Sequence, residues 1–213
     1  MERQIKNKDF KILAAGDIHG DVELTKKLAD KAKEENVDLV ILTGDITFLD
    51  NPVKGIIEPF SKIGKKVLII PGNHEPIATI DFFTQAYKNI QNIHGSYIKI
   101  GDIGIFGAGG ADTGPFSRIS DYEIYKLLKK GFEKLKNTKI RIMATHAHPS
   151  NSLIERIAPG FKGNKGIEMA IKTFKPEIAL CSHIHEAWGI EEKIGNTKLI
   201  NVGREGKIIE ISC

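Results

Sequence analysis

The chain has 213 residues, 41% hydrophobic and 27% charged, which is the composition of a soluble globular protein able to bury a full core. A net charge of +4, with lysines spread among acidic residues, argues against a nucleic-acid-binding stripe. No apolar stretch approaches a membrane span, no signal peptide is visible, and two cysteines, Cys181 and Cys213, argue against a disulfide framework. We therefore expect a single cytoplasmic domain over residues 1–213, without a membrane partner.

The first half of the chain alternates apolar runs with amphipathic segments. Apolar runs that end in glycine or proline predict buried strands, and apolar residues at every third or fourth position predict helices. Three repeats of strand and helix predict a parallel sheet built from βαβ units. The expected strands are 10–15, 37–42 and 67–70, and the expected helices are 22–35, 53–63 and 77–89.

The pattern changes in the second half. Gly101-Asp102 between two apolar runs predicts a hairpin of strands 96–100 and 103–106. The glycine-rich run 107–115 lacks a following Gly-Lys-Ser/Thr sequence, so we do not expect a P-loop. Residues 150–165 are loop-like and suggest a mobile lid.

Strands and helices also fill the rest of the second half. Short strands near the end of the chain predict a second, mixed sheet packed on the first. The expected elements are a helix capped by Asp121 and running to about 136, a helix at 166–174, and strands at 140–145, 176–181, 188–192, 197–202 and 207–211.

Polar side chains follow five of the predicted strands, each directly after an apolar run. Because parallel strands bring their carboxyl ends to one edge of a sheet, we expect these side chains to converge there. The eight polar residues are Asp17 and His19, Asp45, Asn73 and His74, His146, and His183 with His185. Seven of them would form a mixed oxygen and nitrogen ligand set large enough for two divalent metals.

Each segment alone has a structural explanation. An aspartate after a strand can begin a helix, a Gly-Asp pair is a common turn, and a lone buried histidine usually belongs to the core. Histidines at alternate positions also occur on ordinary strands. The coincidence of all five segments at strand ends favours a metal centre.

Five motifs occur in order between residues 10 and 205: Gly16-Asp17-Ile18-His19, Gly44-Asp45, Gly72-Asn73-His74-Glu75, Thr145-His146 and His183-Ile184-His185. This series resembles the calcineurin-like metallophosphoesterase family. The resemblance implies an α/β protein with a four-layer αββα fold, in which two packed mixed β-sheets (a β-sandwich) are flanked by helices. It also implies a dinuclear metal site between the sheets.

The resemblance assigns roles to the residues at the matching positions. The first metal would be held by Asp17, His19, His185 and the shared carboxylate of Asp45. The second would be held by Asp45, Asn73, His146 and His183. His74 matches the family residue that lies beside the metals without binding them and assists at the substrate phosphate.

The sequence departs from the family pattern in two places. Ser182 stands where the family generally has glycine, which we expect to affect backbone packing more than metal ligation. After Gly44-Asp45 the Asp-Arg-Gly continuation of the protein serine/threonine phosphatases is missing, which counts against a phosphoprotein substrate. The C-terminal segment is similar to that of small prokaryotic members.

We therefore predict a phosphoesterase that depends on a dinuclear metal site and hydrolyses phosphodiesters, phosphomonoesters or both. A metal-bridging hydroxide would attack in line, and His74 would assist, oriented by Glu75 or Asp50. The cofactors would be two divalent ions, with Mn favoured and Fe, Ni or Zn as alternatives. His148 and Arg118 are weaker candidates for contact with a small phosphoester substrate.

Two alternatives stay open. The first is a non-catalytic metal-binding scaffold of the same fold, and the second is a nuclease. Retention of all seven candidate ligands disfavours the scaffold, and the missing basic stripe disfavours the nuclease and a nucleic-acid partner. The sequence does not indicate which oligomeric state the protein adopts.

Overall fold

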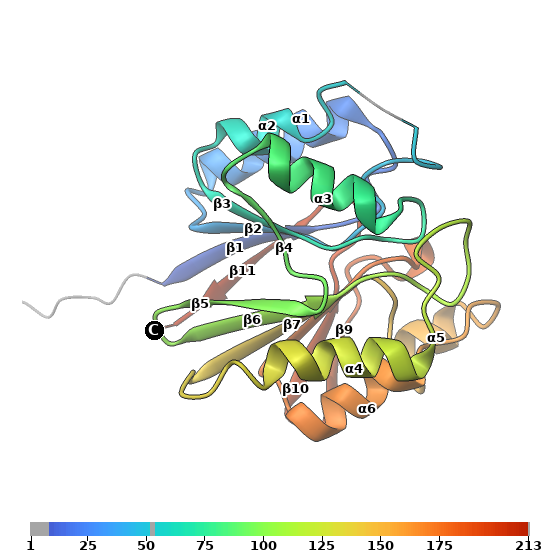
Figure 1. The fold of residues 1–213 in the computed structure, drawn as a ribbon. Coiled ribbons are helices and arrows are strands. Elements are labelled where there is room, and N and C mark those ends of the chain that lie inside the picture. Colours follow the sequence, from blue (N-terminus) through green and yellow to red (C-terminus); the bar gives the residue numbers. More distant parts are fainter. Residues whose placement is uncertain (1–8, 52–53, 213) are drawn as a thin grey trace, which may run out of the picture.

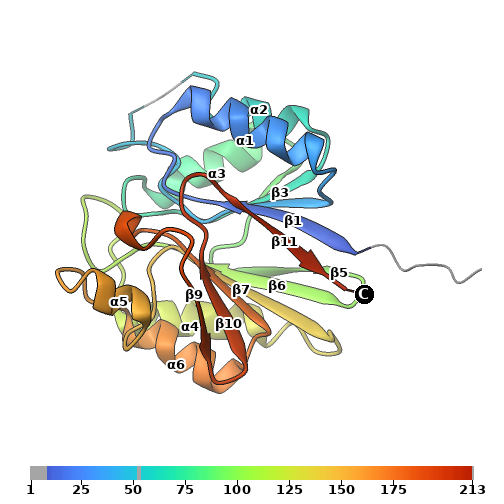
Figure 2. The same cartoon turned by 180° about the vertical axis from the view of Figure 1, so that it is seen from behind.

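Two mixed β-sheets packed face to face form the centre of the computed structural model, which describes residues 9–51 and 54–212 (Figure 1). Helices cover the outer face of each sheet, so the layers follow the order helix, sheet, sheet, helix (Figures 1 and 2). The covering helices are α1 (Val22–Glu34), α2 (Glu58–Lys62) and α3 (Ile77–Ala86) on one side, and α4 (Asp121–Phe132) and α6 (Lys165–Phe174) on the other. The expected four-layer arrangement is confirmed.

The first sheet is built from the predicted βαβ units. Its strands are β1 (Phe10–Ala15), β2 (Leu39–Leu42), β3 (Lys66–Ile69), β4 (Ile90–Asn92) and β11 (Lys207–Ile211). They lie in the order β11-β1-β2-β3-β4, with β1 to β4 parallel and β11 antiparallel to β1. All four residues of β2 are buried, because helices cover one face of this sheet and the other sheet covers the opposite face.

The second sheet begins with the predicted hairpin. Its strands are β5 (Ser96–Ile100), β6 (Ile103–Ala108), β7 (Ile140–Thr145), β8 (Ile178–Cys181), β9 (Glu191–Ile194) and β10 (Thr197–Asn201). They lie in the order β5-β6-β7-β8-β10-β9. The strands β6, β7, β8 and β10 are parallel, so their carboxyl ends reach the same edge.

An aliphatic layer joins the two sheets. From the first sheet it receives Ile41 and Leu68, and from the second Ile105, Ile142 and Leu180, all fully buried. Side chains of this kind contribute about 1.5–3 kcal/mol each when they leave water. This layer fixes the sheets against each other and so fixes the relation between their edges.

The end of the chain differs from the expected second-sheet meander. Strand β11 crosses back and pairs with β1, where Ile209 and Ile211 become buried. Pairing there covers an edge of the first sheet that would otherwise be open. The strand expected at 188–192 begins instead at Glu191, because a 3-10 turn, η1 (His185–Ala187), and a turn at Gly189 precede it.

Local hydrogen bonds accompany two further differences. Helix α4 is capped by Ser120 rather than Asp121, in a capping box in which Ser120 and Glu123 satisfy each other's backbone N–H groups. The segment 150–165 contains a short helix, α5 (Leu153–Ile157), and the Glu155 carboxylate accepts from the N–H of Gly163.

Strand β4 was not expected, and Val53 and Cys213 lie outside the described residues. Among the described residues, no helix is long and apolar enough to cross a membrane.

The inter-sheet layer predicts a large effect of one truncation. Replacing Ile41, which is fully buried, with alanine should lower the free energy of unfolding by about 2–5 kcal/mol, because it leaves a cavity between the sheets. Ile77→Ala is the matched control, since Ile77 is 41% exposed. Urea titration would measure both, and equal losses in the two variants would contradict this account of the core.

Candidate metal centre

Seven candidate ligands and His74 come from the ends of five strands, as the sequence predicts. The first sheet supplies Asp17 and His19 after β1, Asp45 after β2, and Asn73 and His74 after β3. The second sheet supplies His146 after β7, and His183 and His185 after β8. The expectation of one sheet edge therefore needs correction, because the residues meet where edges of both sheets come together.

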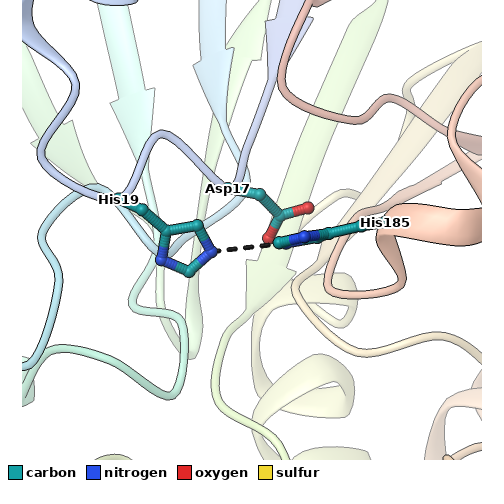
Figure 3. Close-up of side chains that lie close together, drawn as sticks. All are labelled: Asp17, His19 and His185. Atoms are coloured by element: carbon teal, nitrogen blue, oxygen red, sulfur yellow. Dashed lines mark hydrogen bonds between the residues drawn. The ribbon is translucent and has the colours of Figure 1, made fainter.

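The side chains form overlapping groups whose donor atoms lie within 4.8 Å of one another. The groups are Asp17, His19 and His185; Asp45, His146 and His183; and His19, Asp45 and His74. Figure 3 shows the first group, in which the Nε2 atoms of His19 and His185 are 3.3 Å apart. The oxygen Oδ1 of Asn73 lies 2.9 Å from Nε2 of His146, which adds an amide oxygen to the second group.

Four of these residues have left-handed backbone conformations. Their φ angles are 54° at Asp17, 50° at His19, 52° at Asp45 and 71° at His183. Such conformations cost roughly 1–3 kcal/mol each for residues other than glycine and cluster at functional sites. Hydrogen bonds between the strand-end loops hold them, since the N–H of Asp17 donates to Gly44 and that of His19 to Asp45.

Glu75 connects the loops that follow β2 and β3. Its fully buried carboxylate accepts hydrogen bonds from the N–H groups of Gly72 (2.9 Å), Ile46 and Thr47 (both 3.3 Å). Burial, together with the charge of Asp45, raises the pKa of Glu75 to about 7. Glu75 therefore holds the backbone next to two candidate ligands, Asp45 in the loop after β2 and Asn73 in the loop after β3.

The His74 ring was expected to be oriented by the carboxylate of Glu75 or Asp50, but among the described residues Nδ1 of His74 has no hydrogen-bond partner. The Asp50 carboxylate accepts instead from the hydroxyl of Thr79 (2.6 Å). The main chain of His74 is held more firmly, because its N–H donates to Oδ1 of Asp45 (2.9 Å). Backbone contacts thus position this histidine.

His146 is oriented from behind by the Thr43 carbonyl oxygen, which lies 2.9 Å from its Nδ1. A proton on Nδ1 leaves Nε2 free to face Asp45 and Asn73, as a metal ligand requires. The Ser182 hydroxyl, 3.1 Å from the same Nδ1, belongs to this network and also donates to Thr43. Ser182, which stands where the family generally has glycine, therefore contacts a candidate metal ligand, whereas we expected it to affect mainly the backbone packing.

The charges of the group suit a cation. Burial lowers the pKa of His19 to about 4 and that of His183 to about 3, so both rings are neutral at pH 7 and offer lone pairs. Burial raises the pKa of Asp17 to about 6. Burial opposes ionisation of Asp45 as well, but His146 outweighs it and holds the pKa of Asp45 below its usual value.

His146 carries the complementary change. Burial alone would lower its pKa, but the carboxylate of Asp45 raises it to about 9. A proton on His146 therefore balances the charge of Asp45, and a divalent cation between the two groups would replace that proton. Two buried carboxylates, an amide oxygen and neutral imidazoles fit divalent metal ions in donor type and in charge.

The two weaker substrate candidates occupy different environments. His148 is buried, and neither ring nitrogen has a hydrogen-bond partner among the described residues. Burial lowers the pKa of His148, so its ring is neutral. Arg118 is exposed, donates from Nε to the carbonyl of Asp112 (3.1 Å), and lines a groove with His94 and Ile77.

The packing of Gly72 against Asp45 predicts a steric test of the centre. A Cβ at Gly72 would lie 1.9 Å from Oδ1 of Asp45, so Gly72→Ala must displace that carboxylate or the loop. We expect a loss of about 1–3 kcal/mol in stability, measured by thermal unfolding. Gly160→Ala is the control, because nothing lies within 4 Å of its Cβ position. If Gly72→Ala unfolded at the same temperature as the unsubstituted protein, the close packing of Gly72 against Asp45 would be contradicted.

Comparisons with known proteins agree with the geometry. The family model for calcineurin-like phosphoesterases matches residues 10–187. Protein MJ1162 of Methanocaldococcus jannaschii is 30% identical over 203 residues, covering 91% of this chain and 88% of that protein.

Two solved structures share the fold. TT1561 of Thermus thermophilus has a TM-score of 0.75 at 18% identity, covering 95% of this chain and 99% of that one. An archaeal phosphodiesterase has a TM-score of 0.55 at 16% identity, covering 95% and 100%. The motifs, the fold and the match of the family model lead to one conclusion: the chain belongs to the calcineurin-like phosphoesterase family.

Proposed function

We propose that this chain hydrolyses small phosphoric esters with two divalent cations bound at the candidate metal centre. The observation that carries the proposal is that Asp45 belongs to two of the three donor groups, one with His19 and one with His146. Its Oδ2 lies 3.7 Å from Nε2 of His19 and 3.4 Å from Nε2 of His146. A carboxylate with an oxygen close to both groups can serve two cations.

The donor groups suggest how the cations would be held. Asp17, His19 and His185 would hold the first together with Asp45. Asn73, His146 and His183 would hold the second with the same aspartate. Manganese is our first choice, with iron, nickel or zinc as alternatives, because mixed carboxylate, amide and imidazole ligands suit all four.

The cations, when bound, would polarise the phosphate and acidify water for in-line attack. His74 has the position to assist the leaving oxygen. Its Nε2 lies 4.0 Å from Oδ2 of Asp45, and its side chain is 21% exposed, so it adjoins the centre and remains accessible to substrate. A proton donated by His74 would neutralise charge on the leaving group, an effect that typically contributes about 10²–10⁴-fold in rate.

The geometry also permits His74 to act as a ligand, since it forms a donor group with His19 and Asp45. The hydrogen bond from its main-chain N–H to Asp45 is compatible with both roles. We assign it to the substrate because each proposed cation already has four donors. His148, whose ring nitrogens are unpartnered among the described residues, is a further candidate for substrate contact, and Arg118 is a weaker one.

Two variants separate ligation from catalysis. Asp45→Asn should abolish hydrolysis of bis-p-nitrophenyl phosphate with manganese and lower the bound metal, because an amide cannot bridge two cations with negative oxygens. His74→Ala should lower kcat/KM by about 10²–10⁴-fold and keep both metals. Chromogenic assays and elemental analysis of the purified proteins would measure both quantities.

Asp30→Asn and His94→Ala are matched controls, because Asp30 is exposed on α1 and His94 lies outside the donor groups. Both should keep activity and metal. Absence of manganese-dependent turnover of mono- and bis-p-nitrophenyl phosphate by the unsubstituted protein would refute the hydrolase proposal. Loss of a metal in His74→Ala would instead make His74 a ligand.

A further inference from the structure

Two half-exposed phenylalanines stand against histidines of the metal centre. The ring of Phe48 is stacked on that of His74, with centroids 5.0 Å apart and planes at 18°, and it meets the edge of His19 at 5.7 Å. The ring of Phe161 meets His183 edge-on at 6.0 Å. These rings, which we call the aromatic rim, are 47% and 46% exposed.

The backbone that carries Phe48 is held in an unusual conformation. The N–H of Asn51 donates to the carbonyl of Phe48 (3.1 Å), and both residues between them, Leu49 and Asp50, have positive φ angles of 53° and 56°. This is the pattern of a type I′ turn, which normally selects glycine, asparagine or aspartate. A leucine there is unfavourable, and strain of this kind persists where the surrounding structure over-determines it.

Further hydrogen bonds tie this turn to the metal centre. The N–H of Asp50 donates to the carbonyl of His74 (2.8 Å), and its carboxylate accepts from Thr79. The turn is thereby held beside the histidine on which Phe48 stacks.

The segment that carries Phe161 is also anchored. The N–H of Phe161 donates to the carbonyl of Ala158 (2.9 Å), and the nearby N–H of Gly163 donates to the Glu155 carboxylate (2.8 Å). Both rings are therefore placed by ordered backbone, although roughly half of each remains in contact with water.

An exposed aromatic ring beside a phosphate-binding centre offers a stacking surface for a planar group joined to that phosphate. A nucleobase has this shape, and it stacks on aromatic side chains whatever its identity. A polymer would need a continuous basic track for its backbone, whereas the lysines here are dispersed among acidic residues. The chemistry of the rim thus matches a single nucleotide better than a long strand.

We propose that the aromatic rim binds the base of a nucleotide whose phosphate lies at the metal centre. The substrate would then be a phosphoester of mononucleotide size. This inference rests on the proposed function only for the position of the phosphate.

Calorimetry with two phosphates that differ only in the base tests the inference. Adenosine 5′-monophosphate and ribose 5-phosphate would be titrated into the manganese-loaded protein. We expect the adenine compound to bind about 5- to 150-fold more tightly, the range for a base stacked on an aromatic ring. Where either compound is hydrolysed, the ratio of kcat/KM values replaces the ratio of Kd values.

Phe48→Leu and Phe161→Leu should each lower this ratio at least about threefold, because leucine keeps apolar bulk and removes the aromatic face. Phe82→Leu is the matched control, since Phe82 is 63% exposed on α3, where its ring meets that of Phe83. It should leave the ratio unchanged. Thermal unfolding of all three variants would verify folding.

A role of Phe48 in positioning His74 alone would change the binding of both phosphates alike and leave their ratio constant. A constant ratio in both rim variants, equal binding of the two phosphates, or binding of neither would overturn the inference. Phenyl phosphate binding as tightly as the adenine compound, with the same losses in the variants, would support the rim as a site for aryl esters in general.

The outcomes also distinguish this inference from the proposed hydrolase activity. A base preference without turnover of any nitrophenyl ester would refute the hydrolase and retain the nucleotide site. Turnover without a base preference would retain the hydrolase and refute the nucleotide site.

Discussion

The carboxylate of Asp45 is the group on which the arrangement of the centre depends. It is almost fully buried, its backbone has a positive φ, and it belongs to two of the three donor groups. Gly72 packs so closely against it that no side chain fits there. The N–H of His74 donates to it, so this carboxylate joins the loop after β2 to the loop after β3. The surrounding backbone thus holds this charge in place for a cation.

Much of this architecture could be predicted from the chain. Apolar runs of four to six residues, each followed by aspartate, asparagine or histidine, predict parallel strands whose ends carry chemistry. The structure brings all seven candidate ligands and His74 together as that pattern predicts. The strand pattern predicted a second sheet packed on the first, and the order of the four layers followed from the family resemblance.

Other features depend on contacts between distant segments. The pairing of β11 with β1 joins residues about 200 positions apart, and nothing in the local pattern of either strand selects that partner. Glu75, which with Asp50 was one of two expected orienting partners of His74, instead accepts from the backbone N–H groups of three loop residues. The strained turn after Phe48 is likewise invisible in the sequence, because Leu49 has no preference for a left-handed conformation.

Anomalous X-ray diffraction from crystals of the manganese-loaded protein would test the central claim most directly. The account predicts two anomalous peaks roughly 3.5–4 Å apart, both in contact with the carboxylate of Asp45. One peak should also contact Asp17, His19 and His185, and the other Asn73, His146 and His183. A single peak, or two peaks that do not share Asp45, would contradict the account.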